Sequence, residues 1–152
     1  MNSIKYLKFN EIDPDDLLSV LNQQNVRNHL IPHSLFDSCT VRQWIKAKTD
    51  HDSAPGCRIR AVIINNMLAG WCGIQKDNEK FELAIVISKS YWGTGPFIFK
   101  DLLSWAKEFG HQEVLIHLLE PRREYRFLKR ISTITHETKI FGKKFITYHI
   151  AV

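Results

Sequence analysis

Long apolar runs and paired cysteines are what this sequence lacks, and the two absences exclude several classes of protein. No apolar run in the 152 residues approaches the roughly 20 residues that a membrane-spanning helix needs. No basic segment leads into a short apolar stretch, as a secretory signal would require. We therefore expect a soluble, cytoplasmic protein without a membrane segment.

Cysteine is scarce, and the three that occur, Cys39, Cys57 and Cys72, are odd in number and lack a C-x-x-C spacing. This pattern argues against a disulfide framework and against a zinc site, and it favours ordinary reduced thiols. His29 and His33 lie four residues apart but have no third ligand spaced nearby, so we expect no metal. No repeat or low-complexity tract divides the chain, and residues 1–152 are most simply one domain.

Basic residues are unevenly distributed along the chain. The net charge is +5, and residues 76–152 carry 13 basic and 9 acidic side chains against 8 and 7 in residues 1–75. A basic cluster can bind RNA, DNA or a phosphorylated cofactor, or it can be a solvated helix face, and the pattern leaves both open. The excess is concentrated in Arg122, Arg123, Arg126, Lys129 and Arg130.

The clearest positive feature is a strand, a glycine turn and a helix in residues 81–109. The apolar run Leu83–Ile87 suits a strand buried on both faces, and Gly93 and Gly95 break it. Pro96 suits the first turn of an amphipathic helix that ends at Gly110. Such a turn presents backbone N–H groups to a phosphate.

The remaining periodicity predicts strands and helices in the order β-α-α-β-β-β-α-β-α-β-β. We expect a mixed sheet with helices on both faces, in the α+β to α/β range, and a parallel pair where a helix joins residues 81–88 to residues 113–119. The other predicted strands are 4–9, 58–64, 68–74, 138–141 and 144–151, with tight turns at Asn65-Asn66 and Gly142-Lys143. The other predicted helices begin at Pro14 after the cap Asp13, at Thr40 with a Thr40–Gln43 capping box, and at Arg122, and residues 49–56 read as a loop.

Three segments resemble the GNAT superfamily of N-acetyltransferases: residues 69–74, residues 87–95, and the pair 25–30 and 40–45. The Tyr91-Trp92-Gly93-Thr94-Gly95 sequence is similar to the branch that acetylates ribosomal-protein N-termini. The resemblance implies an α+β fold whose mixed sheet is mostly antiparallel around a central parallel pair. It also implies acetyl-CoA as co-substrate and direct transfer to an amine.

The resemblance places acetyl-CoA on one strand and the turn after it. The implied cofactor-binding residues are Ile85, Val86, Ile87, Trp92, Gly93, Thr94, Gly95 and Phe97. The family's Gln/Arg-x-x-Gly-x-Gly/Ala loop falls on residues 92–97, where two positions depart from it. Phe97 replaces a small residue, and Pro96 removes an N–H group that donates to phosphate.

For the chemistry, the resemblance makes Glu82 the first candidate for the base that takes the amine proton. His117 is a second candidate base, since its unperturbed pKa is suitable. The usual proton donor, a tyrosine, falls on Leu128, so Tyr125 one turn earlier is the substitute. Each also has a structural interpretation, as a solvent-facing strand residue, a core histidine and a core tyrosine. Asn25, Arg27, His29 and His33 are candidates for the acceptor pocket.

The sequence therefore predicts an N-acetyltransferase acting on a primary amine of a small molecule, peptide or protein. The alternative is a catalytically degenerate acyl-CoA-binding or interaction module, RNA- or ribosome-associated through the basic cluster. The C-terminal hairpin leaves a strand edge that can pair between subunits, so both a monomer and a homodimer are compatible with the sequence.

Overall fold

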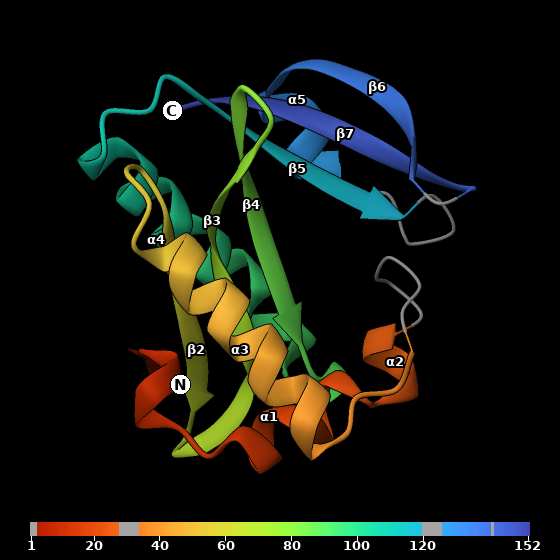
Figure 1. Cartoon of the computed structure of the whole chain (residues 1–152). Coiled ribbons are helices and arrows are strands. Elements are labelled where there is room, and N and C mark those ends of the chain that lie inside the picture. The colour runs from red at the N-terminus through yellow and green to blue at the C-terminus, as the bar shows by residue number, and fades with distance from the viewer. Residues whose placement is uncertain (1–2, 28–33, 120–125, 141) are drawn as a thin grey trace.

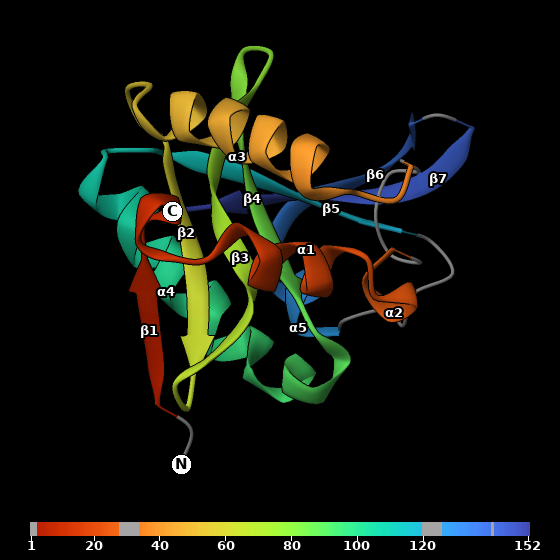
Figure 2. The ribbon, with the colours of Figure 1, turned by 60° about the horizontal axis from the view of Figure 1, so that its bottom comes forward.

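The computed structural model describes residues 3–27, 34–119, 126–140 and 142–152. Within these residues, seven strands form a single sheet in the order β1-β2-β3-β4-β5-β7-β6. Every neighbouring pair is antiparallel except β4 and β5. In the turned view of Figure 2, β1 lies at one edge of the sheet, and β6 and β7 lie at the far side. The mixed, mostly antiparallel sheet with a central parallel pair is thus confirmed.

The elements of the first half of the chain follow the predicted order. They are β1 (Ile4–Leu7), a 3-10 turn (Phe9–Glu11), α1 (Pro14–Leu21), α2 (Gln24–Arg27), α3 (Ser38–Asp52), β2 (Arg58–Ile64) and β3 (Met67–Asp77). Asp13 caps α1 by accepting from the Asp15 N–H, as the sequence predicts. The turn between β2 and β3 consists of Asn65 and Asn66, both with positive φ.

The second half begins with the central strands. It comprises β4 (Lys80–Ile87), a 3-10 helix (Lys89–Thr94), α4 (Gly95–Glu108), β5 (Glu113–Leu119), α5 (Arg126–Ile131), β6 (Ser132–Ile140) and β7 (Lys143–Ala151). Gly110 ends α4 with a φ of +81°. None of the helices in these described residues combines the length and the hydropathy of a membrane span.

Two hydrophobic cores lie on opposite faces of the sheet, so the predicted placement of helices on both faces is confirmed. One core packs α1 and α3 through Leu17, Leu21 and Val41 against Trp71 and Val86. The other packs α4 through buried residues such as Ile98 and Leu102, with Leu128 of α5, against the opposite side of the strands. Figure 1 shows α3 in front of β2 and β3 and α4 behind them.

Several predicted boundaries were wrong. The helix predicted to begin at Thr40 begins at Ser38, because Asp37 is its N-cap and forms the capping box with Thr40. It runs through to Asp52, so the first part of the predicted loop 49–56 is helical. Strand β3 extends three residues beyond its predicted end, and β6 begins six residues before its predicted start. Propensity locates an element, but cross-strand pairing sets its ends.

Gly70 explains how β3 and β4 come so close near the centre of the sheet. Its φ is +156°, and a Cβ atom there would overlap the backbone carbonyl oxygen of Val86 on β4. The register between β2 and β3 shifts beside it, after Val62. Only glycine permits this approach, which sets the backbone position at the end of β4.

Candidate functional site

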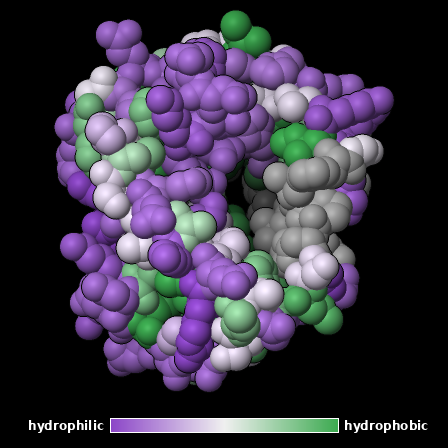
Figure 3. Space-filling view, viewed as in Figure 1, coloured by the Kyte–Doolittle hydropathy of each residue, from purple (hydrophilic) through white to green (hydrophobic). Residues whose placement is uncertain are grey.

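A cavity opens where the parallel strands β4 and β5 part. The two strands pair only at Glu82 with Leu115 and at Leu83 with Ile116, and Figure 1 shows them diverging beyond that point. Among the described residues, the edge of β4 from Ala84 to Ile87 therefore has no strand partner on the β5 side. A cavity of about 360 Å³ occupies the gap, and Figure 3 shows a hollow in the centre of this face, beside α3.

The alternation of side chains along β4 gives this cavity two sides. Ala84 and Val86 belong to the face covered by α1 and α3, together with Trp71. Leu83, Ile85 and Ile87 belong to the face covered by α4. The cavity reaches both faces, because its wall includes Trp44 and Lys48 of α3 as well as Pro96 and Phe99 of α4. Two molecules can thus approach each other through the gap from opposite faces of the sheet.

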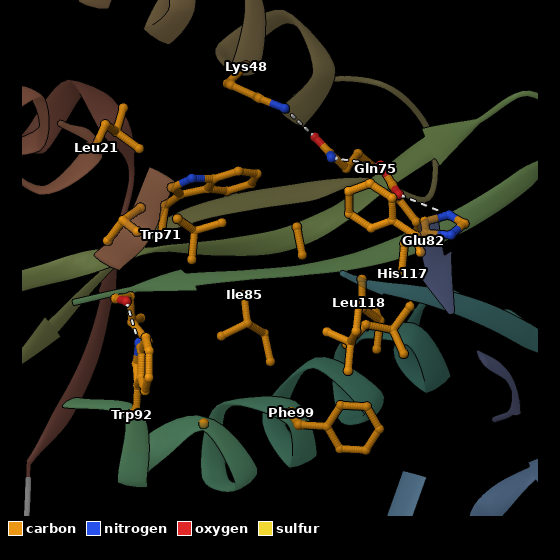
Figure 4. A pocket seen from close by; sticks show the side chains of 18 of the residues that line it. Leu21, Lys48, Trp71, Gln75, Glu82, Ile85, Trp92, Phe99, His117 and Leu118 are labelled. Atoms are coloured by element: carbon orange, nitrogen blue, oxygen red, sulfur yellow. Dashed lines mark hydrogen bonds and ion pairs between the residues drawn. The ribbon is translucent and has the colours of Figure 1, made fainter. Parts of the chain in front are cut away.

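On the α3 side, polar side chains form a hydrogen-bonded line across the strands. The Lys48 ammonium donates to Gln75 Oε1 at 2.6 Å, and Gln75 Nε2 donates to Glu82 Oε1 at 2.9 Å. The other oxygen of Glu82 lies 3.4 Å from His117 Nε2. Figure 4 shows the first four members in this order above the strands. His117 Nδ1 lies 2.7 Å from the Thr147 hydroxyl, which fixes the orientation of the imidazole ring.

Burial sets the charge properties of this line. Burial raises the pKa of the Glu82 carboxyl above its ordinary value, while the neighbouring His117 acts in the opposite direction. Burial likewise lowers the pKa of the Lys48 ammonium. A carboxyl with a raised pKa is a stronger base once it has lost its proton, so Glu82 suits the acceptance of a proton from an amine.

Asp77, Glu82 and His117 form the one group of potential metal ligands found among the described residues. One donor atom from each lies within 4.8 Å of the others, and Asp77 Oδ2 is 3.2 Å from His117 Nε2. The same distances suit a hydrogen-bonded acid-base group, in which Gln75 and Thr147 satisfy the outer atoms. The expectation of no metal stays a prediction, which activity after treatment with a chelator would check.

Aromatic side chains line the α3 side of the cavity. Trp44 packs edge-on against Trp71 with ring centroids 5.4 Å apart, and Phe36 packs edge-on against Trp44. The Lys48 ammonium lies 4.8 Å from the Trp71 centroid and 5.5 Å from that of Trp44. Trp44, Trp71 and Trp92 all form part of the cavity wall.

On the α4 side, the segment after β4 is a 3-10 helix that leads directly into α4, in place of the predicted glycine turn. Gly93 and Gly95 both lack a positive φ, and an added Cβ atom would meet nothing within 4 Å at either position. The Gly95 N–H donates to the Trp92 carbonyl, and Pro96 has no N–H. The open space above the two glycines fits a phosphate-bearing group, but Gly95 and Pro96 offer no free donor to it.

Some predicted cofactor-binding residues lie at the cavity and others do not. Ile85, Val86, Ile87, Trp92 and Gly95 line it, and Trp92 Nε1 donates to the Ile87 carbonyl at 3.1 Å. Phe97 is 63% exposed and does not form part of the wall. Thr94 is buried, and its hydroxyl donates to the Tyr91 carbonyl. The substitution at Phe97 therefore leaves the cavity open.

Some of the candidate catalytic and acceptor-site residues lie at the cavity, and others do not. Glu82 and His117 lie together in the cavity, and Asn25 lies at its rim. Leu128 is buried and faces the cavity, so the position that the resemblance gives to a tyrosine is apolar here. Tyr125, His29 and His33 lie outside the described residues. Arg27 ends α2 and is not part of the cavity wall among the described residues.

The sequence patterns did not identify Lys48, Gln75, Asp77 or Thr147 as members of the site. The signal for Gln75 and Asp77 was present. Trp71, Gly73, Gln75 and Asp77 alternate along β3, so all four lie on the same face of the sheet. Ending the predicted strand at residue 74 concealed this alternation.

Known proteins resemble this chain in structure but not in sequence. No protein-family model matches the sequence, and no curated protein is similar to it in sequence. Solved structures do match over nearly the whole chain. A protein from Bordetella pertussis assigned to the GNAT family of acetyltransferases is 13% identical and covers 97% of this chain and 95% of its own, with a TM-score of 0.77.

Two further structures are similar over 99% of this chain. A spermidine N-acetyltransferase from Vibrio cholerae in complex with CoA and spermine is 14% identical, is covered over 95% of its length and has a TM-score of 0.70. A ribosomal-protein-alanine N-acetyltransferase from Brucella melitensis is 15% identical, is covered over 99% of its length and has a TM-score of 0.70.

Proposed function

From the GNAT fold that this chain shares with those structures, we propose that it is an acetyl-CoA-dependent N-acetyltransferase acting on a primary amine. The observation that carries the proposal is the position of Glu82, a half-buried carboxylate at the last residues where β4 and β5 still pair. One face of the gap has space for the pantetheine arm, and the other has room for an amine beside this carboxylate.

Different residues at the gap have different roles in acetyl transfer. Backbone groups of Ile85 to Ile87, which have no strand partner on the β5 side, bind the pantetheine arm and polarise the thioester carbonyl. Glu82 accepts the proton that the amine loses, and His117 orients and balances the Glu82 charge. Acetyl-CoA supplies the activated acetyl group. The amine nitrogen attacks its carbonyl carbon, a C–N bond forms and the C–S bond breaks.

The departing thiolate also needs a proton. Leu128 carries no donor, so the proton comes from water or from Tyr125, which stays a prediction. Protonation by water slows the reaction without preventing it, because a thiol of ordinary pKa near 8.5 is only a moderately basic leaving group. We expect a functional enzyme with modest turnover.

The test is a binding measurement followed by a turnover measurement. Acetyl-CoA should bind the purified protein in calorimetry, and release of free CoA should depend on an added amine from a panel of amino acids, polyamines and peptides. An absence of acetyl-CoA binding at millimolar ligand would contradict the proposal.

A second candidate, a degenerate acyl-CoA-binding module, is favoured by the apolar Leu128 at the donor position. Binding of CoA without turnover across the whole panel would support it. An RNA-associated role through Arg122, Arg123, Arg126, Lys129 and Arg130 also stays a prediction. Lys129 and Arg130 are exposed on α5, which is compatible with it. Salt-dependent RNA binding would support that role.

A further inference from the structure

One cation on the α3 side of the cavity has no negatively charged partner. The Lys48 ammonium donates to Gln75, and no carboxylate among the described residues forms an ion pair with it. The Lys48 side chain lines the cavity.

Buried charged groups in native proteins normally have partners, so the Lys48 ammonium favours a ligand that accepts hydrogen bonds and carries negative charge. The cation–π contacts of Lys48 with Trp71 and Trp44 hold the ammonium against the wall and shield it from solvent. The opposite charge, on Glu82, lies at the other end of the Gln75 side chain. A cation and an anion thus flank one carboxamide.

We propose that the amine acceptor is a free α-amino acid with an apolar side chain, whose carboxylate is bound by Lys48. This inference rests on the proposed function. The amino group of such an acceptor lies toward Glu82 and its carboxylate toward Lys48, so the two charges of the ligand meet the opposite charges of the site. Leu21, Val26 and Phe36 provide an apolar wall on the same side of the cavity for its side chain.

A matched pair of acceptors separates the carboxylate from all other features of the ligand. L-leucine and L-leucinamide differ only in that group, and the amide has the less basic amine. A preference for leucine therefore does not come from the fraction of unprotonated amine. We expect the wild-type protein to show a higher kcat/KM for leucine than for leucinamide, and higher than for spermidine.

Substitutions at Lys48 test the proposed partner. A hydrogen bond between charged groups supports an expected fall of about tenfold or more in kcat/KM for leucine in Lys48→Met, with less than about a threefold change for leucinamide. Lys48→Glu should reverse the preference toward the amide and spermidine. Lys46→Met and Lys46→Glu on the exposed side of α3 are the controls and should change neither ratio.

The outcomes separate the inference from the proposed function. Three results would overturn the inference but leave acetyl transfer standing. They are a preference for leucinamide or spermidine, an equal loss of kcat/KM for leucine and leucinamide in Lys48→Met, and acetylation of Lys48 itself, seen in the intact mass. Turnover of no amine would remove the proposed function. In that case the binding of the product tests the inference. N-acetyl-leucine should bind the wild-type protein in the presence of CoA, and its affinity should be about tenfold lower in Lys48→Met. An absence of N-acetyl-leucine binding would overturn the inference.

Discussion

Glu82 is the residue at which the fold and the proposed chemistry meet. It pairs with Leu115 in the parallel ladder, and its side chain lies in the cavity that opens just beyond. Its two carboxylate oxygens have different partners, since Gln75 donates to one and His117 lies beside the other. This arrangement holds the carboxylate at the gap, and its burial favours the acceptance of a proton.

Replacing this residue should affect activity in a pH-dependent way. The Glu82→Gln variant keeps the shape and the contact with Gln75 but cannot accept a proton, so we expect kcat/KM to fall by about 10²- to 10⁴-fold. The wild-type pH profile should have an acidic limb above the ordinary glutamate pKa of about 4.3, because burial raises the pKa of Glu82. Initial rates from pH 5 to 9 check both. An unchanged acidic limb in the variant would assign that limb to another group.

The same variant should be more stable than the wild type at neutral and alkaline pH. Because the pKa of Glu82 is raised by folding, the charged carboxylate costs stability above that pKa, and the cost disappears as pH falls below the unfolded value near 4. We expect a higher Tm for Glu82→Gln at pH 8 and a difference that shrinks toward pH 4. Thermal unfolding followed by circular dichroism tests this. A lower Tm at pH 8 would mean that His117 stabilises the carboxylate more than burial destabilises it.

At the scale of elements, the parting of β4 and β5 creates the site. Gly70 allows β3 to approach Val86 closely, and the apolar residues of β4 are then buried on both faces of the sheet. The following 3-10 helix and α4 form the floor of the cavity on one side, while α3 forms its roof on the other (Figure 4). The cavity thus results from the packing of two helices over strands that cannot pair along their whole length.

Gly95 tests whether the space above the first turn of α4 belongs to a ligand. Its φ of −50° and ψ of −46° are helical, so Gly95→Ala should stabilise the fold by about 0.5 to 1 kcal/mol. The new methyl group meets no protein atom within 4 Å but occupies the proposed phosphate space, so CoA affinity should fall about tenfold. Calorimetry and thermal unfolding measure the two effects.

Ser104→Ala provides the control for that substitution. Ser104 is exposed on the same helix, and alanine there should raise helix stability through propensity alone, without a change in CoA affinity. Equal CoA affinity in Gly95→Ala and the wild type would show that the cofactor does not lie over this turn.

The sequence predicts the strand and the helix of residues 81–109 well, because the apolar run, the proline and the terminal glycine are all local signals, but it does not predict the 3-10 helix between them. It misplaces the start of α3, because Thr40 and Gln43 have the capping-box spacing, whereas in the structure Asp37 is the N-cap and accepts from the Thr40 N–H. The line from Lys48 through Gln75 to Glu82 joins three separate elements. Its members meet only through the strand register and the placement of α3, which no local pattern specifies.

At the scale of the whole molecule, two cores on opposite faces of one sheet leave a passage between them. The core under α1 and α3 surrounds the proposed acceptor side, and the core under α4 surrounds the proposed CoA side. The antiparallel pair of β7 and β6 extends the sheet beyond β5 and provides Thr147, which holds His117 in place. Each part of the fold thus contributes to one side of the gap.

The structure of the protein with bound CoA would test this arrangement most directly. We predict that the pantetheine arm lies along Ala84 to Ile87 on the unpaired edge of β4, with the pyrophosphate over Gly93 and Gly95. The thiol should enter the gap from the α4 side and point toward Glu82. A CoA molecule bound elsewhere, or with its thiol away from Glu82, would contradict the account.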